Sequence, residues 1–237
     1  MLFRFVGVLI RTIIAVFIVL IAPAQADEAS NREAQIILHM LDYVSIDYCG
    51  SVLYGKVLNE TEFQEQLGFA EQAAMLMNRL PEHPKQAALI AQAVEIAAKV
   101  KERAPADHVS VLAQQLHKSV IETYQVPVSP RRIPETLPAL ALFQQLCVPC
   151  HGTTGHGDGQ FSKVLNPKPA NFHDDIRMSQ RSVYGLYGSI SLGVGNTAMR
   201  AFSQLSDEDR WALAFLVSNF RKSPEQIEQG RKLWEKR

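Results

Sequence analysis

The sequence contains few cysteines and no surplus of positive charge. Its 237 residues include three cysteines, 24 lysines and arginines, and 24 aspartates and glutamates. Nucleic-acid-binding proteins usually carry a strongly basic surface, so this balance argues against that class. After residue 26 the chain also lacks an apolar run of the roughly 20 residues that a membrane-spanning helix needs. No transmembrane segment is therefore expected after residue 26.

The first 26 residues lack acidic side chains and have the order of a secretory signal peptide. Arg4 and Arg11 accompany an apolar run from Ile13 to Ala22, and Ala24-Gln25-Ala26 offers a small-x-small cleavage site. An uncleaved N-terminal anchor is the alternative interpretation. Cleavage would remove 26 of the 237 residues and two of the 24 basic ones, leaving 211 residues with 22 basic and 24 acidic side chains. We expect this mature chain in the periplasm.

Two of the three cysteines lie in the segment 147-CVPCH-151. A disulfide between Cys147 and Cys150 would close a tiny loop and stabilise nothing distant. A structural zinc site needs a second ligand pair, and the sequence has no other Cys-x-x-Cys and no His-x-x-x-His. A thioredoxin-like pair needs a βαβ context, which the neighbouring sequence does not show. The remaining interpretation is covalent haem c on Cys147 and Cys150, with His151 on the iron.

Four stretches before residue 126 carry apolar residues at helical spacing. The expected helices cover residues 29–48, 60–80, 87–100 and 109–120. Four antiparallel helices with short connections predict a helical bundle domain over residues 27–125. Four prolines within residues 126–138 then predict a semi-rigid linker over 126–137.

The residues after this linker predict a second helical domain over residues 138–222. A short helix from Pro138 leads into Cys147, and a helix over 182–192 ends at a glycine. The segment 206-SDED-209 has the form of a helix N-cap with an acidic first turn, before an apolar helix. Residues 223–237 are expected to form a C-terminal helical tail or the start of a further segment. The predicted fold class is all-α.

The motifs of this second domain resemble a class I cytochrome c over roughly residues 137–221. They are 147-CVPCH-151, 155-GHGDG-159, 197-TAMRAF-202 and 206-SDEDRWALAFLV-217. The resemblance implies that His151 and Met199 are the axial ligands of the haem iron, Met199 through its thioether sulfur. A methionine ligand raises the haem potential relative to histidine. His156, His173 and Met178 are alternative ligands, although His156 lies only five residues beyond His151.

The first domain carries a second resemblance. The stretch 41-LDYVSIDYCGSVLYGKVLNETEFQEQLGF-69 is similar to the N-terminal region of bacterial iron permeases of the oxidase-dependent iron transporter family that are fused to a cytochrome c. In those proteins a periplasmic helical segment and a haem c domain precede a membrane-embedded permease. The resemblance implies a role in iron transport and a membrane iron permease as partner. The iron-binding glutamates of the permease lie in membrane helices and have no counterpart here.

Carboxylates in the expected bundle suggest a metal site of its own. Asp42 and Asp47 lie on the first expected helix, and Glu65 lies on the second. Iron favours carboxylate oxygens as ligands, and helical bundles place such ligands on inward-facing positions. A capping box from Asn59 to Glu62 and an ordinary solvated acidic face are the alternatives. Cys49 has no partner once the haem takes the other two thiols, and we expect a small buried hydrophobic residue there.

These observations predict a periplasmic electron-transfer protein with one covalent haem c, and no enzyme. The sequence offers no distal acid–base pair beside Met199, which a peroxidase would need. The expected partners are a redox protein and a membrane iron permease, and no nucleic acid. The alternative function is a cytochrome c subunit of a respiratory or oxidoreductase complex unrelated to iron.

Overall fold

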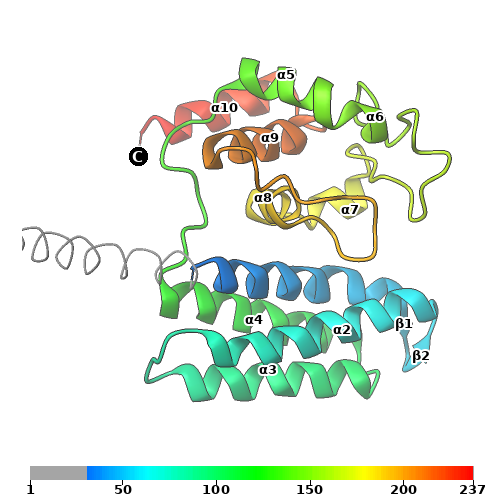
Figure 1. The fold of residues 1–237 in the computed structure, drawn as a ribbon, viewed down its shortest axis with the longest axis vertical. Coiled ribbons are helices and arrows are strands. Elements are labelled where there is room, and N and C mark those ends of the chain that lie inside the picture. The colour runs from blue at the N-terminus through cyan, green and yellow to red at the C-terminus, as the bar shows by residue number, and fades with distance from the viewer. Residues whose placement is uncertain (1–30, 237) are drawn as a thin grey trace, which may run out of the picture. The chain divides into compact units, whose positions relative to one another are not determined.

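A computed structural model describes residues 31–236 of the chain. The contacts between backbone positions divide the chain into two compact units, which meet between Val126 and Pro127. Both units are mostly helical (Figure 1). Among the described residues, no helix combines the length and the apolar character needed to cross a membrane. The signal peptide predicted at residues 1–26 lies outside the described residues.

The first unit is a bundle of helices. It contains a helix over residues 31–51, α2 (Glu60–Leu76), the short 3₁₀ helix η1 (Met77–Arg79), α3 (Gln86–Lys101) and α4 (Ala106–Tyr124). α2 packs against α3, and α3 packs against α4, so helices that are consecutive in the chain are neighbours in space (Figure 1). The four predicted helices are all present. The helix predicted over residues 60–80 differs at its end, because α2 stops at Leu76 and the 3₁₀ helix η1 continues it to Arg79.

An apolar stripe on each helix builds the core of the bundle. On the helix over residues 31–51, Ile37, Leu41 and Val44 are at most 1% exposed. Four α4 side chains spaced by three or four residues are completely buried: Val109, Ala113, Leu116 and Val120. Full burial of one large aliphatic side chain contributes roughly 1.5–3 kcal/mol. The bundle therefore has a continuous core made by its own helices.

A short β-hairpin joins the first helix to α2, and the sequence pattern did not predict it. β1 (Val52–Leu53) pairs antiparallel with β2 (Lys56–Val57). Between the strands, Tyr54 and Gly55 have φ angles of 50° and 73°. Two successive positive φ values are typical of the tight turns that match the twist of a hairpin. Two-residue strands are too short to show an alternating pattern, so the all-α prediction holds for the helices and omits this pair.

The second unit surrounds a core rich in aromatic side chains. Its helices are α5 (Thr136–Leu146), α6 (Val148–His151), α7 (Asp175–Ser179), α8 (Val183–Leu192), α9 (Asp207–Asn219) and α10 (Pro224–Trp234). α9 packs against both α5 and α8. The buried core includes Phe143, Phe172, Tyr187, Trp211 and Val217. The sequence missed α6 and α7, because helices of four and five residues are too short for a periodic pattern.

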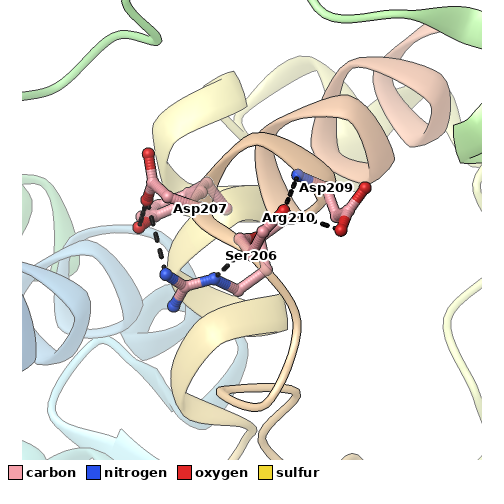
Figure 2. A network of polar contacts seen from close by, with 5 residues as sticks. Ser206, Asp207, Asp209 and Arg210 are labelled. Atoms are coloured by element: carbon pink, nitrogen blue, oxygen red, sulfur yellow. Dashed lines mark hydrogen bonds and ion pairs between the residues drawn. The ribbon is translucent and has the colours of Figure 1, made fainter.

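Serine caps begin two helices of this core, α8 and α9. The Ser182 hydroxyl accepts the Gly185 N–H at 2.9 Å at the start of α8, and the Ser206 hydroxyl accepts the Asp209 N–H at 3.1 Å at the start of α9. Ser206 also donates to the Asp209 carboxylate at 2.6 Å (Figure 2). Such a cap contributes about 1 kcal/mol. The N-cap predicted from 206-SDED-209 is confirmed.

Candidate functional site

Cys147, Cys150 and His151 lie within one helical turn. Cys147 ends α5, where its N–H donates to the Phe143 carbonyl at 2.9 Å, and α6 begins at the next residue. The Cys147 carbonyl in turn accepts the N–H groups of Cys150 at 3.1 Å and of His151 at 2.8 Å. Residues three and four apart on a helix are neighbours on its surface. The fold therefore gathers the two thiols and the imidazole on one side of this turn.

The two thiols are free and half-buried. Burial raises the pKa of the Cys147 thiol to about 12, and the neighbouring Cys150 adds to the rise. A thiol with such a pKa stays protonated at neutral pH and is a poor nucleophile, whereas redox-active cysteines have a lowered pKa. This environment does not suit a thioredoxin-like pair.

A backbone hydrogen bond decides which nitrogen of His151 carries its proton. Nδ1 of His151 lies 3.1 Å from the carbonyl oxygen of Ala170. Because a carbonyl oxygen can only accept, Nδ1 is the donor and Nε2 keeps its lone pair. The ring also stacks on Phe172, with centroids 4.6 Å apart. An imidazole oriented through Nδ1, with Nε2 available, is the usual arrangement of a metal-binding histidine.

The charge state of His151 agrees with this arrangement. Burial lowers the pKa of His151, and the hydrogen bond to Ala170 opposes this effect without cancelling it. The imidazole is therefore neutral at pH 7, as a metal ligand must be. Sequence reasoning did not find Ala170 or Phe172 as partners of His151. The only available signal was the proline-rich segment 165–172, whose path in space the sequence does not show.

The glycine-rich loop after His151 brings the partner segment into place. Gly157 has a φ of 72°, and a Cβ at this position would lie 2.5 Å from the carbonyl oxygen of Pro169. Only glycine combines that backbone conformation with so close an approach. Nearby, the Phe172 N–H donates to the Gly155 carbonyl at 2.7 Å. These contacts hold the segment that carries Ala170 against the loop.

Met199 lies on the loop that connects α8 to α9. Its carbonyl accepts the Val194 N–H at 2.8 Å, and its N–H donates to the Thr197 hydroxyl at 3.1 Å. Gly193 begins this loop with a φ of 75°, and a Cβ there would lie 2.7 Å from the backbone nitrogen of Ala201. The loop is therefore a tightly bonded turn. It holds Met199, which is half-buried, against the same apolar core that Cys147 contacts.

The alternative ligands have other contacts. Met178 is 5% exposed and belongs to the core of the second unit. His156 and His173 stack on each other, with ring centroids 4.1 Å apart. Nε2 of His173 lies 2.7 Å from the Thr154 carbonyl, which makes this nitrogen a donor and removes it from metal binding in this conformation.

The carboxylate site expected from Asp42, Asp47 and Glu65 stays a prediction. Within residues 31–236 no group of three or more His, Cys, Asp or Glu side chains is placed so that it could hold a metal ion. Asp47 does lie near Glu65: burial raises the pKa of Glu65, and the charges of Glu62 and Asp47 raise it further. Asp42 precedes Asp47 by five residues, which is about 140° around a helix, so the two aspartates lie on different sides of the first helix.

The expectation that Cys49 is buried was wrong. Its side chain is exposed, and its sulfur lies 3.1 Å from the carbonyl of Ile46. The preceding residue, Tyr48, is the one that the helix buries, at 1% exposed. One residue further along a helix is a rotation of about 100°, which takes Cys49 off the apolar stripe.

Comparisons with known proteins match the two parts of the chain to two different families. The model of the iron permease-associated 4-helix bundle domain matches residues 23–127, and the cytochrome c model matches residues 139–220. A solved structure titled "Kuenenia stuttgartiensis reducing HAO-like protein complex Kustc0457/Kustc0458" is 25% identical, with a TM-score of 0.36. That match covers 48% of this chain and 60% of the other. None of the curated proteins compared with the chain matches it.

Both family resemblances that were expected from the sequence are confirmed, and the mostly helical fold agrees with them. The cytochrome c family implies a covalently bound haem c and a role as an electron carrier. The free thiols of Cys147 and Cys150 and the available Nε2 of His151 fit that group. The chain thus combines an iron permease-associated 4-helix bundle domain, residues 23–127, with a cytochrome c domain, residues 139–220.

Proposed function

We propose that this protein is a periplasmic monohaem cytochrome c that transfers single electrons, and that its bundle couples this transfer to iron uptake by a membrane iron permease. The joining of a cytochrome c domain to an iron permease-associated bundle in one chain supports the proposal. Cytochrome c domains are typically found outside the cytoplasm. That location agrees with the signal peptide predicted at residues 1–26, and the mature protein would begin at residue 27.

In this proposal four side chains hold the haem. Cys147 and Cys150 would attach one porphyrin through thioethers, since both thiols are free and lie within one helical turn. Nε2 of His151 and the sulfur of Met199 would bind the iron. When bound, the haem supplies a one-electron couple between ferric and ferrous iron, whose potential depends on its axial ligands and on burial.

The hydrogen bond from His151 Nδ1 to the Ala170 carbonyl is the observation that carries the haem assignment. It presents Nε2 as an unprotonated nitrogen, fixes the direction of the ring and increases the basicity of the ligand. The bond thus supports a metal ligand at the position that the Cys-x-x-Cys-His motif indicates.

The fixed conformation of the Met199 loop supports electron transfer over catalysis at the iron. Hydrogen bonds to Val194 and Thr197 hold the backbone of Met199 on both sides. A ligand held in this way would keep the sixth position of the iron filled, so no substrate would reach it. The protein would then exchange electrons with its partner through the haem edge and bind no small molecule there.

The bundle would recognise the permease, and the permease would hold the iron. The described residues provide no metal site with three ligands in the bundle, so direct transfer of iron from the bundle is not part of the proposal. The bundle would instead keep the haem domain beside the permease, where iron is oxidised or reduced before transport.

The covalent haem is tested by extraction of the mature protein with acidified acetone. We expect the colour to stay on the polypeptide, because thioether bonds survive this treatment. A Cys147→Ser/Cys150→Ser double variant should lose its haem or release it into the organic phase. Cys49→Ser, which removes the exposed thiol of the other unit, is the matched control and should behave like the wild type. Haem that leaves the wild-type protein would contradict the proposal.

The link to iron uptake needs a separate experiment. A strain that lacks the protein should take up less iron and grow poorly in iron-limited medium, and the wild-type gene should restore uptake. His151→Ala, which removes the proposed axial ligand, should not restore it. If the deletion leaves iron uptake unchanged, the cytochrome serves another electron-transfer chain, whatever the result of the haem extraction.

A further inference from the structure

The second unit buries a tryptophan against a tyrosine in a contact that the proposed haem site does not use. The rings of Tyr187 and Trp211 stack with centroids 4.2 Å apart and an angle of 15° between their planes. Each side chain is 4% exposed. The two rings belong to the apolar core that Cys147 and Met199 contact. Two oxidisable side chains are therefore in van der Waals contact within the core that also receives Cys147 and Met199.

The hydroxyl of Tyr187 has a proton acceptor in place. It donates to the Asp207 carboxylate at 2.6 Å. Arg210 lies 3.4 Å from the same oxygen (Figure 2). Burial and the hydrogen bond to Asp207 raise the pKa of Tyr187 to about 12, so the phenol keeps its proton at neutral pH. A phenol that loses one electron becomes a strong acid. Asp207 can accept the released proton across the existing hydrogen bond.

A row of aromatic rings leads from this pair toward solvent. Trp211 lies 6.5 Å from Phe215, and Phe215 lies 6.1 Å from Trp234, measured between ring centroids. Trp234, on α10, is half-buried. Trp211 and Trp234 are the two tryptophans of the chain. Indole and phenol rings lose single electrons far more easily than a phenyl ring, so Phe215 serves as a bridge between the two indoles.

We propose that Trp234, Trp211 and Tyr187 form a relay that conducts single electrons through the second unit. A one-electron oxidant, such as a radical derived from peroxide, takes an electron from Trp234, which releases its indole proton to water. Trp211 then donates one electron to the oxidised Trp234, and Tyr187 donates one electron to the oxidised Trp211. Trp234 regains its proton from water, the buried Trp211 passes through a radical cation and keeps its proton, and Tyr187 passes its proton to Asp207 as it becomes a neutral phenoxyl radical.

The relay would protect the sulfur atoms of the haem site. Methionine sulfur is readily oxidised to the sulfoxide, and Met199 contacts the same core as the ring pair. A phenoxyl radical on Tyr187 can be reduced by an external reductant, so the Met199 sulfur is not permanently lost as a ligand. This protective role depends on the proposed haem site, whereas the electron transfer itself is a property of the polypeptide and is testable without reference to the haem.

The relay is tested on the haem-loaded protein by pulse radiolysis with dibromide radical anions, which oxidise tryptophan preferentially at neutral pH. In the wild type, the absorption of the indolyl radical should decay while that of a phenoxyl radical rises. The rate should not depend on protein concentration, because the electron moves within one molecule. Tyr187→Phe keeps the ring and should reduce the phenoxyl yield severalfold. Tyr54→Phe, at an exposed site in the other unit, is the matched control and should leave it unchanged.

Two further variants test the proton acceptor and the entry point. Asp207→Asn keeps the shape of the side chain but removes the base, and should slow the rise of the phenoxyl signal severalfold. Trp234→Phe should lower the initial yield of indolyl radical, because the buried Trp211 is shielded from solvent. Near-ultraviolet circular dichroism checks that each variant keeps its aromatic packing. A wild type without a concentration-independent phenoxyl rise, or an equal yield in Tyr187→Phe, would overturn the relay.

Discussion

The properties of His151 and Met199 arise from contacts made by single atoms. The carbonyl of Ala170, 19 residues away in the chain, determines which nitrogen of His151 can bind a metal. Met199 is positioned by its own backbone groups, which bond to Val194 and Thr197 and leave its sulfur uncommitted. In the proposed haem site these two residues would supply ligand atoms of different chemistry, an imidazole nitrogen and a thioether sulfur.

Replacement of the proposed sulfur ligand should change the haem spectroscopically. In Met199→His, the far-red charge-transfer band typical of ferric haem with a methionine ligand should disappear. The reduction potential should fall, because imidazole stabilises ferric iron better than a thioether does. Met178→Leu, which replaces a methionine buried in the core, is the control and should keep the band. A band that survives Met199→His and vanishes in Met178→Leu would assign the ligand to Met178.

A second residue-scale prediction concerns Glu65 in the bundle. Burial raises its pKa, and so do the charges of Glu62 and Asp47. A raised pKa means that the folded state binds this proton more tightly than the unfolded state, so stability falls as the pH rises through the raised value. Glu65→Gln should therefore stabilise the bundle at pH 7. The gain should disappear below the ordinary glutamate pKa of 4.5.

The measurement for Glu65→Gln is urea denaturation followed by circular dichroism between pH 4 and pH 8. Glu71→Gln, on the same helix but fully on the exposed side, is the matched control and should show no such pH-dependent gain. Equal effects of the two substitutions at every pH would show that Glu65 carries no electrostatic penalty in the folded bundle.

The sequence predicted the long helices of the protein better than its short elements. The helices with clear apolar spacing or a serine cap were predicted to within a few residues, as in α3 and α9. The hairpin and α6 and α7 were missed, because elements of two to five residues contain too few positions to show a period. Loops are held by individual contacts instead: the Met199 loop keeps its shape through Gly193 and through the hydrogen bond from the Val194 N–H to the Met199 carbonyl.

Two glycine substitutions should have opposite effects on stability. Gly193→Ala places a Cβ 2.7 Å from backbone and requires a left-handed φ, so it should cost more than about 1 kcal/mol and disturb the Met199 loop. Gly68→Ala, inside α2 with no atom within 4 Å of the added Cβ, should stabilise the bundle by about 0.5–1 kcal/mol. Thermal unfolding measures both. An equal effect of the two changes would contradict the glycine conformations of the structure.

At the scale of the whole molecule, each unit has a core built from its own side chains. The core of the second unit draws only on residues after the boundary at Pro127, and the helices before that boundary bury their stripes against one another. Among the described residues, the protein therefore consists of two domains. One carries the Cys-x-x-Cys-His motif, and the other matches the iron permease-associated bundle.

The two units should unfold in separate transitions. The haem absorbance reports on the second unit, and the far-ultraviolet circular dichroism reports on both. Gly68→Ala should shift only the transition that leaves the haem absorbance unchanged, because it lies in the bundle. A single transition in which both signals shift together would show that the units fold as one cooperative body.

The sequence by itself determined the features that depend on residues close together in the chain. The Cys-x-x-Cys-His motif, the apolar stripes of the bundle and the Ser206 cap each lie within a few residues, so chain geometry alone brings their atoms together. Only the tertiary structure decided which distant residues meet. It placed Ala170 beside His151 and stacked Tyr187 on Trp211. Such contacts follow from the packing of whole helices and loops, which local spacing does not encode.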